Sequence, residues 1–298
     1  MSPASIKELL TTSSKMKNVL SLEGCTSATL NINQGVPRRS SLSPLLFALY
    51  INDLPSTTKL TPTLFADVTV LYISGSNSTE LQSIVNTKLE KVNEWLHFNK
   101  LSLNYSKASY MIVSRKNNQL ADFNVKINDK TIARTICVKY LRVFIDDKLT
   151  WSKHIAYLEN KLSRSVGRFY RIRQYLRDSA LKSLYFSFVD SHLQFAIGAW
   201  GGVGITTLNQ LNALHNKIIR AMTYSSFRTK ITPLCKKLNL LKLDDIYSLE
   251  LGKIMHKFHS GNLPDNFNHL FTPVNQVHCH ATRSATTTRC ILLANGPH

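Results

Sequence analysis

The chain has 298 residues, and 43% of them are hydrophobic, an ordinary share for a globular protein that argues against disorder throughout. Its 37 lysine and arginine residues outnumber its 18 aspartate and glutamate residues and give a formal net charge of +19. The longest apolar run, residues 44–51, is far shorter than the ~20 residues that a membrane helix needs, so no membrane association is expected. Widely scattered cysteines and early charged residues favour an intracellular protein, cytoplasmic or nuclear, over a secreted one.

The positive charge is concentrated in the second half of the chain. Residues 1–80 carry six basic and five acidic residues, whereas residues 150–298 carry nineteen and seven. A field of this sign attracts polyanions, and nucleic acid is the natural partner. The alternative is a generally basic surface that has no defined site.

The first half reads as helices and short strands. Residues 40–50 form an apolar stretch with Pro44 in the first turn of an expected helix. Residues 60–73 predict a hairpin of two strands around Ala66 and Asp67. A long helix then follows, with Ser78 or Thr79 as its expected cap. Residues 105–114 and 137–145 are β-like.

From residue 152 the pattern changes to successive helices, expected over residues 179–197, 206–224, 229–238 and 244–260 after a first one that follows Ser152. On that first helix, apolar residues from Leu158 to Leu176 step by three or four, and a basic row lies on a neighbouring face. The fold class is therefore α+β, with a first domain over residues 1–150, a basic helical domain over 151–272 and an irregular tail over 273–298.

An ordered series of short motifs runs through most of the chain. Its members are Gln34-Gly35-Val36-Pro37, Tyr50-Ile51-Asn52-Asp53-Leu54-Pro55, Phe65-Ala66-Asp67, Leu101-Ser102-Leu103-Asn104, Lys139-Tyr140-Leu141, Phe144-Ile145-Asp146 and Leu149-Thr150-Trp151. Together they resemble the reverse transcriptase of non-LTR (LINE-type) retrotransposons, over roughly 270 residues, as a truncated and degenerate copy.

The resemblance implies a partial polymerase palm, which is an antiparallel sheet with helices, followed by an all-helical thumb-like domain. It implies an RNA template, a DNA primer and Mg²⁺, with Asp67 as a metal ligand and Lys107 as a proton donor to the leaving pyrophosphate. The residues implied to bind template or nucleotide are Gln34, Gly35, Pro37 and Phe65. Those implied to bind the primer or the duplex are Lys139, Tyr140, Lys161, Arg164, Arg168 and Arg171.

Plainer interpretations of these residues stay open. Asp67 is also a reasonable hairpin-turn residue, and Lys107 a solvated lysine. The row from Lys161 to Arg171 is also what an ordinary exposed helix face looks like. Near the C-terminus, His278-Cys279-His280 and Cys290 follow no usual zinc spacing.

Departures from the family pattern predict that this chain alone does not polymerise. The second hairpin aspartate is replaced by Val68, and the stretch before Gln34 offers only Glu8 and Glu23 in place of an earlier palm aspartate. Two metal ions held ~3.5–4 Å apart repel each other strongly, so several carboxylates must hold them. The fingers are also expected to be missing.

Three further functional hypotheses compete with an inactive reverse transcriptase domain. The first is an active enzyme whose missing strand comes from another chain or a longer isoform. The second is a non-catalytic RNA- or DNA-binding protein that uses the basic helices. The third is a translated relic without a selected role.

Overall fold

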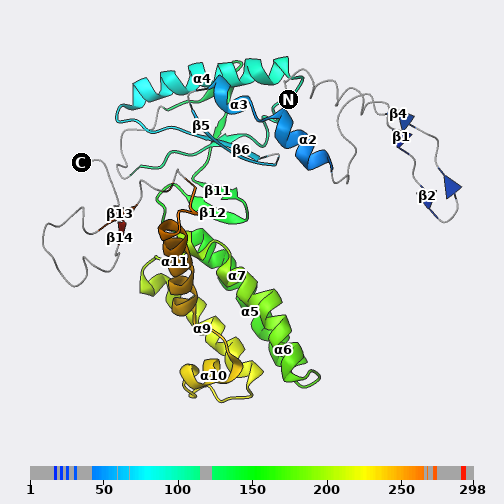
Figure 1. The fold of residues 1–298 in the computed structure, drawn as a ribbon, viewed down its shortest axis with the longest axis vertical. Helices are drawn as coiled ribbons and strands as arrows, with labels where there is room; N and C mark the ends of the chain where they lie inside the picture. The colour runs from blue at the N-terminus through cyan, green and yellow to red at the C-terminus, as the bar shows by residue number, and fades with distance from the viewer. Residues whose placement is uncertain are drawn as a thin grey trace, which may run out of the picture. The chain divides into compact units, whose positions relative to one another are not determined.

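The computed structural model describes residues 17–18, 21–22, 25–26, 30–31, 42–58, 60–66, 68–114, 123–264, 267, 271–273 and 290–292. They combine helices with small sheets, as an α+β chain should (Figure 1). The chain divides into two compact units, Met1–Ile136 and Cys137–His298. Among the described helices, none has the length and apolar character that crossing a bilayer requires.

The core of the first unit lies under its long helix. Strands β5 (Thr61–Phe65) and β6 (Val68–Tyr72) form the expected antiparallel hairpin. Helices α2 (Leu42–Tyr50) and α3 (Leu54–Thr57) precede it. Val92 and Trp95 of helix α4 pack with residues of α2, α3 and the hairpin, so burial of one face of α4 holds these elements together.

Helix α4 spans Ser78–Phe98, and its N-cap residue lies one position before the first of the two expected caps. The cap is Asn77, not Ser78 or Thr79, because the Asn77 side-chain oxygen accepts a hydrogen bond from the Thr79 backbone N–H at 3.2 Å. A side-chain oxygen at this position satisfies one of the free N–H groups of the first turn.

A second cluster in the first unit packs on another part of α4. Phe123, Val125, Ile127 and Ile132 are buried there beside partly buried residues of the helix. The strands of this unit are short: outside β5–β6 they are β1 (Lys17–Asn18), β2 (Ser21–Leu22), β3 (Cys25–Thr26), β4 (Leu30–Asn31), β7 (Ser109–Tyr110), β8 (Lys126–Ile127), β9 (Lys130–Thr131) and β10 (Ala133–Arg134). They pair as β1–β4, β2–β3, β8–β9 and, in parallel, β7–β10. Residues 105–114 were expected to be β-like, but within them only Ser109 and Tyr110 form a strand.

The second unit opens with a hairpin that leads into its main helix. Strands β11 (Cys137–Tyr140) and β12 (Val143–Asp146) are antiparallel, and β12 packs on helix α5 (Ser152–Ile172). The Asp146 carboxylate accepts hydrogen bonds from the Thr150 and Trp151 backbone N–H groups, both at 2.8 Å. Burial acts to raise the pKa of Asp146, but these hydrogen bonds outweigh it and lower that pKa. The hairpin therefore belongs with the helices, and the two units meet before residue 137 instead of at residue 150.

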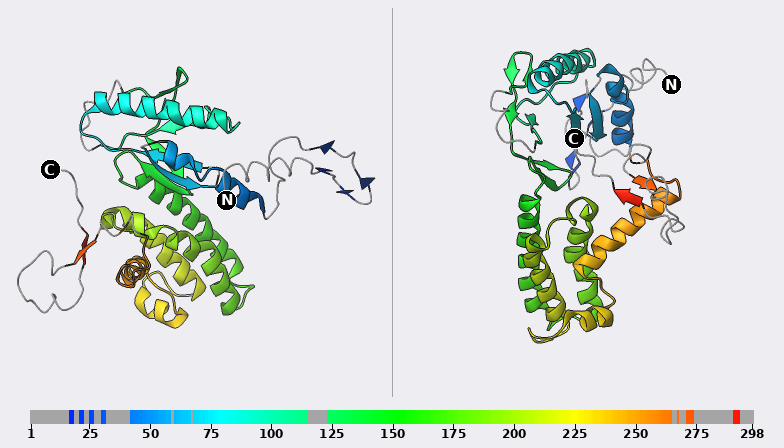
Figure 2. Two further views of the ribbon diagram at one scale, coloured as in Figure 1. Left: turned by 45° about the horizontal axis from the view of Figure 1, so that its top comes forward. Right: turned by 90° about the vertical axis from the view of Figure 1, so that its left-hand side faces the viewer.

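The helices of the second unit share one apolar core. Leu158, Leu162 and Phe169 of α5 are buried in it, and α5 runs beside α9 (Figure 2). The remaining helices are α6 (Asp178–Tyr185), the π-helical turn η1 (Phe186–Asp190), α7 (Ser191–Gln194), α8 (Ile197–Trp200), α9 (Ile205–Met222), α10 (Ile231–Leu238) and α11 (Leu243–His259).

Three expectations for this unit need correction. The single helix over residues 179–197 is interrupted by η1 and ends at Gln194, because the backbone of Phe195 turns to an extended conformation. Leu176 lies beyond the end of α5 and is exposed, so it is not part of the apolar face. Strand β13 (Phe271–Pro273) pairs with β14 (Cys290–Leu292), so residues 273–298 include a paired strand where only irregular structure was expected.

Candidate nucleic-acid interface

Of the predicted site residues of the first unit, the structure describes Phe65 and Lys107. Gln34, Gly35, Pro37 and Asp67 lie outside the described residues. Phe65 ends strand β5 with an exposed side chain, and its backbone pairs with that of Val68. Lys107 lies in an exposed turn, where its backbone N–H donates to the Asn104 carbonyl at 3.1 Å. Among the described residues of this unit, no hydrogen bond joins Lys107 and Phe65, which lie on different elements.

The hairpin has a poor donor set for metal ions. Asp67 is the sole carboxylate in the sequence from residue 60 to residue 76, and the described residues beside it, Ala66 and Val68, offer no side-chain oxygen. Across the described part of the chain, no three His, Cys, Asp or Glu side chains come together as metal ligands would. One carboxylate does not fit a pair of closely spaced Mg²⁺ ions.

In the second unit, three of the predicted cations come together on α5. Lys161, Arg164 and Arg168 are spaced by three and four residues, so they share one face of the helix. Ser165 lies between them and donates a hydrogen bond from its hydroxyl to the Lys161 carbonyl at 3.1 Å. Because Leu162 and Phe169 fix a neighbouring face of α5 in the core, the cationic face has a defined direction.

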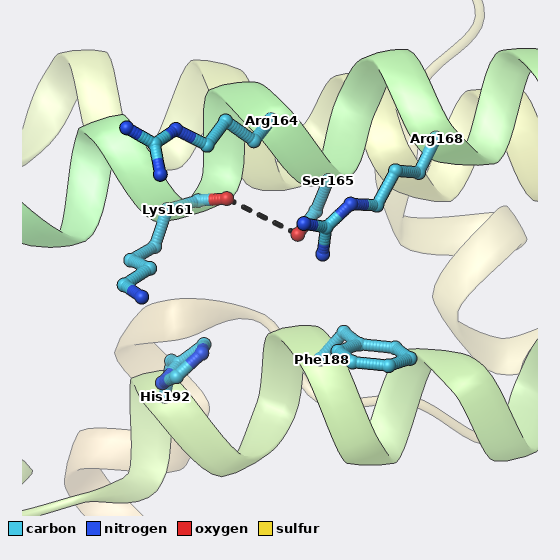
Figure 3. Close-up of a pocket in the computed structure, with 6 residues that line it drawn as sticks. All are labelled: Lys161, Arg164, Ser165, Arg168, Phe188 and His192. Carbon is cyan, nitrogen blue, oxygen red and sulfur yellow. Dashed lines mark hydrogen bonds between the residues drawn. The ribbon is translucent and has the colours of Figure 1, made fainter.

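The π-helical turn and α7 supply the facing wall of a groove. Phe188 of η1 and His192 of α7 line, with the α5 residues, a cavity of about 200 Å³. Figure 3 shows Lys161 reaching from α5 toward His192, and Arg168 toward Phe188. The Arg168 guanidinium lies 5.7 Å from the centre of the Phe188 ring, within the range of a cation–π contact. A π-helical turn is rare and frequently marks a functional position in a helix.

The groove is strongly electropositive. No aspartate or glutamate lines it, and no described carboxylate lies within ion-pair distance of Lys161, Arg164 or Arg168. Burial, together with the positive charges of Lys161 and Arg142, lowers the pKa of His192. His192 is therefore neutral at pH 7, and an anion bound beside it would favour its protonation.

One further predicted residue, Lys139, lies with Lys161 of the groove around Tyr157. The Lys139 ammonium of β11 lies 5.4 Å from the centre of the Phe144 ring and 5.8 Å from that of Tyr157. The Lys161 ammonium lies 5.5 Å from the same Tyr157 ring. The aromatic face thus gathers two cations from two elements, and extends the basic surface from α5 to the β11–β12 hairpin.

The remaining predicted residues of this unit do not join the groove. Arg171 is exposed on α5 beyond the cavity, and Tyr140 is half-buried in β11 opposite Val143. Phe188, His192, Arg142 and Tyr157 are the contributors that the sequence interpretation did not assign to the site. A weak signal existed, since Phe188 and His192 are four residues apart on an expected helix and so share a face.

The sequence comparisons identify a family for the first half of the chain. The model of the family described as "Reverse transcriptase (RNA-dependent DNA polymerase)" matches residues 3–158, more than half of the chain. The chain belongs to this reverse transcriptase family, and within it to the reverse transcriptases of non-LTR retrotransposons.

Its relatives are polymerases of mobile elements. The chain is 25% identical over 77% of its length to the probable RNA-directed DNA polymerase from transposon X-element of Drosophila melanogaster. It is 22% identical over 76% to that from mobile element jockey of the same species, and 23% over 80% to that of jockey from Drosophila funebris. The chain spans about a quarter of the length of these relatives. No solved structure matches it.

Proposed function

We propose that this reverse transcriptase domain binds RNA or DNA through the groove between α5 and η1–α7, and does not itself polymerise. The observation that carries the proposal is the convergence of Lys161, Arg164 and Arg168 on a cavity without a carboxylate, opposite Phe188 and His192. The relatives are named RNA-directed DNA polymerases, so an RNA template and a DNA primer are the proposed substrates.

The size and chemistry of the groove suit the backbone of a nucleic acid. A cavity of about 200 Å³ is smaller than the roughly 300–1,000 Å³ pockets that enclose a whole small ligand, so it suits one or two phosphate groups of a longer chain. Arginine forks bind phosphate oxygens through two parallel hydrogen bonds, and lysine adds a point charge. The aromatic ring of Phe188 supports Arg168 from the other wall.

The electrostatic repulsion among these three cations also supports a bound anion. Two like charges three or four residues apart on one helix face destabilise the helix by about 0.2–0.5 kcal/mol. Lys161, Arg164 and Arg168 form two such pairs, without a described carboxylate to offset them. A bound phosphate would supply the missing negative charge.

We propose that the partial palm covers residues 1–150, including the β11–β12 hairpin that packs with the helices, and that the helices after it have a thumb-like role, as the family resemblance suggests. Lys139 and Lys161, which both lie over Tyr157, are then proposed to contact the same duplex. For Lys107, and for the segment with Gln34, Gly35 and Pro37, we propose only the roles that the family resemblance implies.

The proposed loss of polymerisation rests on Val68. Two doubly charged ions 4 Å apart repel by about 16 kcal/mol at an effective dielectric near 20, so paired carboxylates are needed to hold them. In this hairpin Val68 stands beside Asp67 where the family has a second aspartate. Mg²⁺ binding at Asp67 is therefore proposed to be weak, and we derive no chemical step through it.

The test combines binding and primer extension on one preparation of the full chain. A labelled RNA–DNA duplex should bind to it, while neither the chain nor its Asp67→Ala variant should extend a primer on an RNA template with Mg²⁺ or Mn²⁺. Product that disappears in the variant would contradict the inactivity, and would mean that another chain supplies carboxylates. Absence of duplex binding would contradict the proposed function itself.

A further inference from the structure

A group of exposed aromatic rings lies where the C-terminal end of α5 approaches the turn between α9 and α10. Tyr170 and Tyr175 belong to the end of α5 and the turn after it, and Tyr224 and Phe227 to the turn between α9 and α10. Tyr175 and Phe227 are 78% and 75% exposed, and Tyr170 and Tyr224 are also exposed. Exposed apolar groups that cluster in this way mark a binding surface.

Arg173 joins the two segments. Its guanidinium lies 4.8 Å from the centre of the Tyr170 ring and 4.6 Å from that of Tyr224. The same guanidinium donates to the Ala221 carbonyl at 3.3 Å, and the Tyr224 hydroxyl donates to the Arg173 carbonyl. Tyr175 is two residues from Arg173, and Phe227 is three residues from Tyr224. Their Cα atoms therefore lie within about 10 Å of those two residues. Tyr170 and Tyr224 thus flank one guanidinium, and the exposed rings of Tyr175 and Phe227 belong to the same two turns.

This surface is held rigidly, which a stacking site needs. Arg220 of α9 donates from two of its nitrogens to the Thr229 carbonyl, at 3.2 and 3.1 Å, and so closes the turn that carries Tyr224 and Phe227. Its guanidinium also lies 5.4 Å from the centre of the Phe227 ring. A fixed ring loses little conformational entropy when a planar ligand stacks on it.

The charge of this part of the sequence indicates the class of ligand. Residues 160–243 contain fourteen lysine and arginine residues and two aspartates, Asp178 and Asp190. Protein interfaces are depleted in lysine, whereas aromatic rings among basic residues are what single-stranded nucleic acid uses, with its bases stacked and its phosphates neutralised. Paired bases cannot use such rings, because their faces are already stacked inside a duplex.

We infer that Tyr170, Tyr175, Tyr224 and Phe227, assembled around Arg173, form a stacking platform for unpaired bases of single-stranded nucleic acid. This inference rests on the proposed function, since it assumes that the basic unit meets nucleic acid. It adds a second site: the groove faces η1 and takes backbone phosphates, whereas the platform lies where α5 meets α9 and takes bases. RNA and DNA share the ring faces that the platform recognises.

The test removes two rings that make few structural contacts. A Tyr175→Leu/Phe227→Leu variant of the full chain is compared with Tyr72→Leu/Phe98→Leu, which removes one exposed tyrosine and one exposed phenylalanine from the first unit. Fluorescence anisotropy measures binding of labelled oligo(U), oligo(dT) and an RNA–DNA duplex, and circular dichroism verifies folding. We expect the platform variant to lose about tenfold or more in affinity for single strands, as the loss of base–aromatic stacking predicts. Its duplex affinity and the control variant should stay within about twofold of the original chain.

Each other outcome has a definite meaning. Unchanged single-strand affinity, or an equal loss for single strand and duplex, would overturn the platform while leaving the groove in place. Polyglutamate that displaces oligo(U) from the original chain but not from the platform variant would overturn it in favour of an acidic protein partner. A chain that binds no nucleic acid would overturn both the platform and the proposed function. Loss of affinity for oligo(U) alone or for oligo(dT) alone would support the platform and would identify RNA or DNA, respectively, as its ligand.

Discussion

The Tyr185 hydroxyl and the His215 Nε2 atom lie 2.7 Å apart inside the helical unit, and each residue is only 1% exposed. Their hydrogen bond joins α6 to α9 in the core on which the groove is built. Burial raises the pKa of Tyr185 and lowers the pKa of His215 to about 4, so both side chains are neutral at pH 7.

This pair makes the helical unit sensitive to acid. The pKa of His215 is about 4 in the folded chain, below its ordinary value near 6.5, so the unfolded chain binds the extra proton first as the pH falls. The free energy of unfolding should therefore be fully retained above pH ~6.5 and fall by about 3 kcal/mol toward pH 4. Urea unfolding at several pH values measures this slope.

His215→Leu should be less stable at pH 7 by about 1–3 kcal/mol, because the Tyr185 hydroxyl loses its partner, yet it should show a flatter pH dependence. His256→Leu, at an exposed histidine of α11, is the matched control and should keep the original slope. An unchanged slope in His215→Leu would show that other groups cause the acid sensitivity.

Restoring a carboxylate to the hairpin should restore metal affinity. Val68 is 39% exposed and begins strand β6, so an aspartate there can stay hydrated and costs at most about 1 kcal/mol in strand preference. We expect Val68→Asp to bind Mn²⁺ more tightly than the original chain, as measured by electron paramagnetic resonance of free Mn²⁺. Val68→Asn, which has the same shape without the charge, should show no gain. Equal Mn²⁺ binding by all three would mean that the hairpin is not a metal site.

The core of α5 should determine whether the groove exists. Leu162 is fully buried between the cations of the groove face and the rest of the core. Leu162→Ala should reduce the free energy of unfolding by about 2–5 kcal/mol, because it removes buried apolar contacts and leaves a cavity. Leu176→Ala, at the exposed leucine beyond the helix, should change it by less than about 0.5 kcal/mol. Similar losses for the two variants, in thermal or denaturant unfolding, would contradict the packing described for α5.

Binding of nucleic acid in the groove should be linked to protonation of His192. Its pKa is lowered by burial and by the charges of Lys161 and Arg142, and a phosphate in the groove would offset those charges. Affinity for an RNA–DNA duplex should therefore rise as the pH falls from 8 to 6, because the bound form takes up a proton. His192→Gln should flatten this dependence and His256→Gln should not, in titrations at constant ionic strength. A steeper dependence in His192→Gln would reverse the proposed linkage.

The sequence predicted those features that depend on local periodicity. The β-rich apolar residues on either side of Ala66 and Asp67 predicted the β5–β6 hairpin, and three-to-four spacing predicted α4, α5 and the basic row of Lys161, Arg164 and Arg168. The facing wall was not predictable in the same way. Phe188 and His192 reach the groove because η1 interrupts the helix and α5 packs beside it, and neither the π-helical turn nor that packing leaves a periodic signal. The choice of Asn77 over Ser78 as a cap depends likewise on backbone geometry, since either residue type can cap a helix.

The salt dependence of duplex binding tests the groove most directly. Each phosphate contact changes the slope of log affinity against log salt concentration by about 0.9 on a B-form duplex. The Lys161→Gln/Arg164→Gln/Arg168→Gln variant is compared with Lys88→Gln/Lys91→Gln/Lys126→Gln, which removes the same three charges from the first unit. We predict that the groove variant binds an RNA–DNA duplex more weakly, with a slope reduced by about 2–3, and that the control keeps the original slope. Equal changes in the two variants would show that only net charge matters, and would contradict a phosphate-binding groove between α5 and η1–α7.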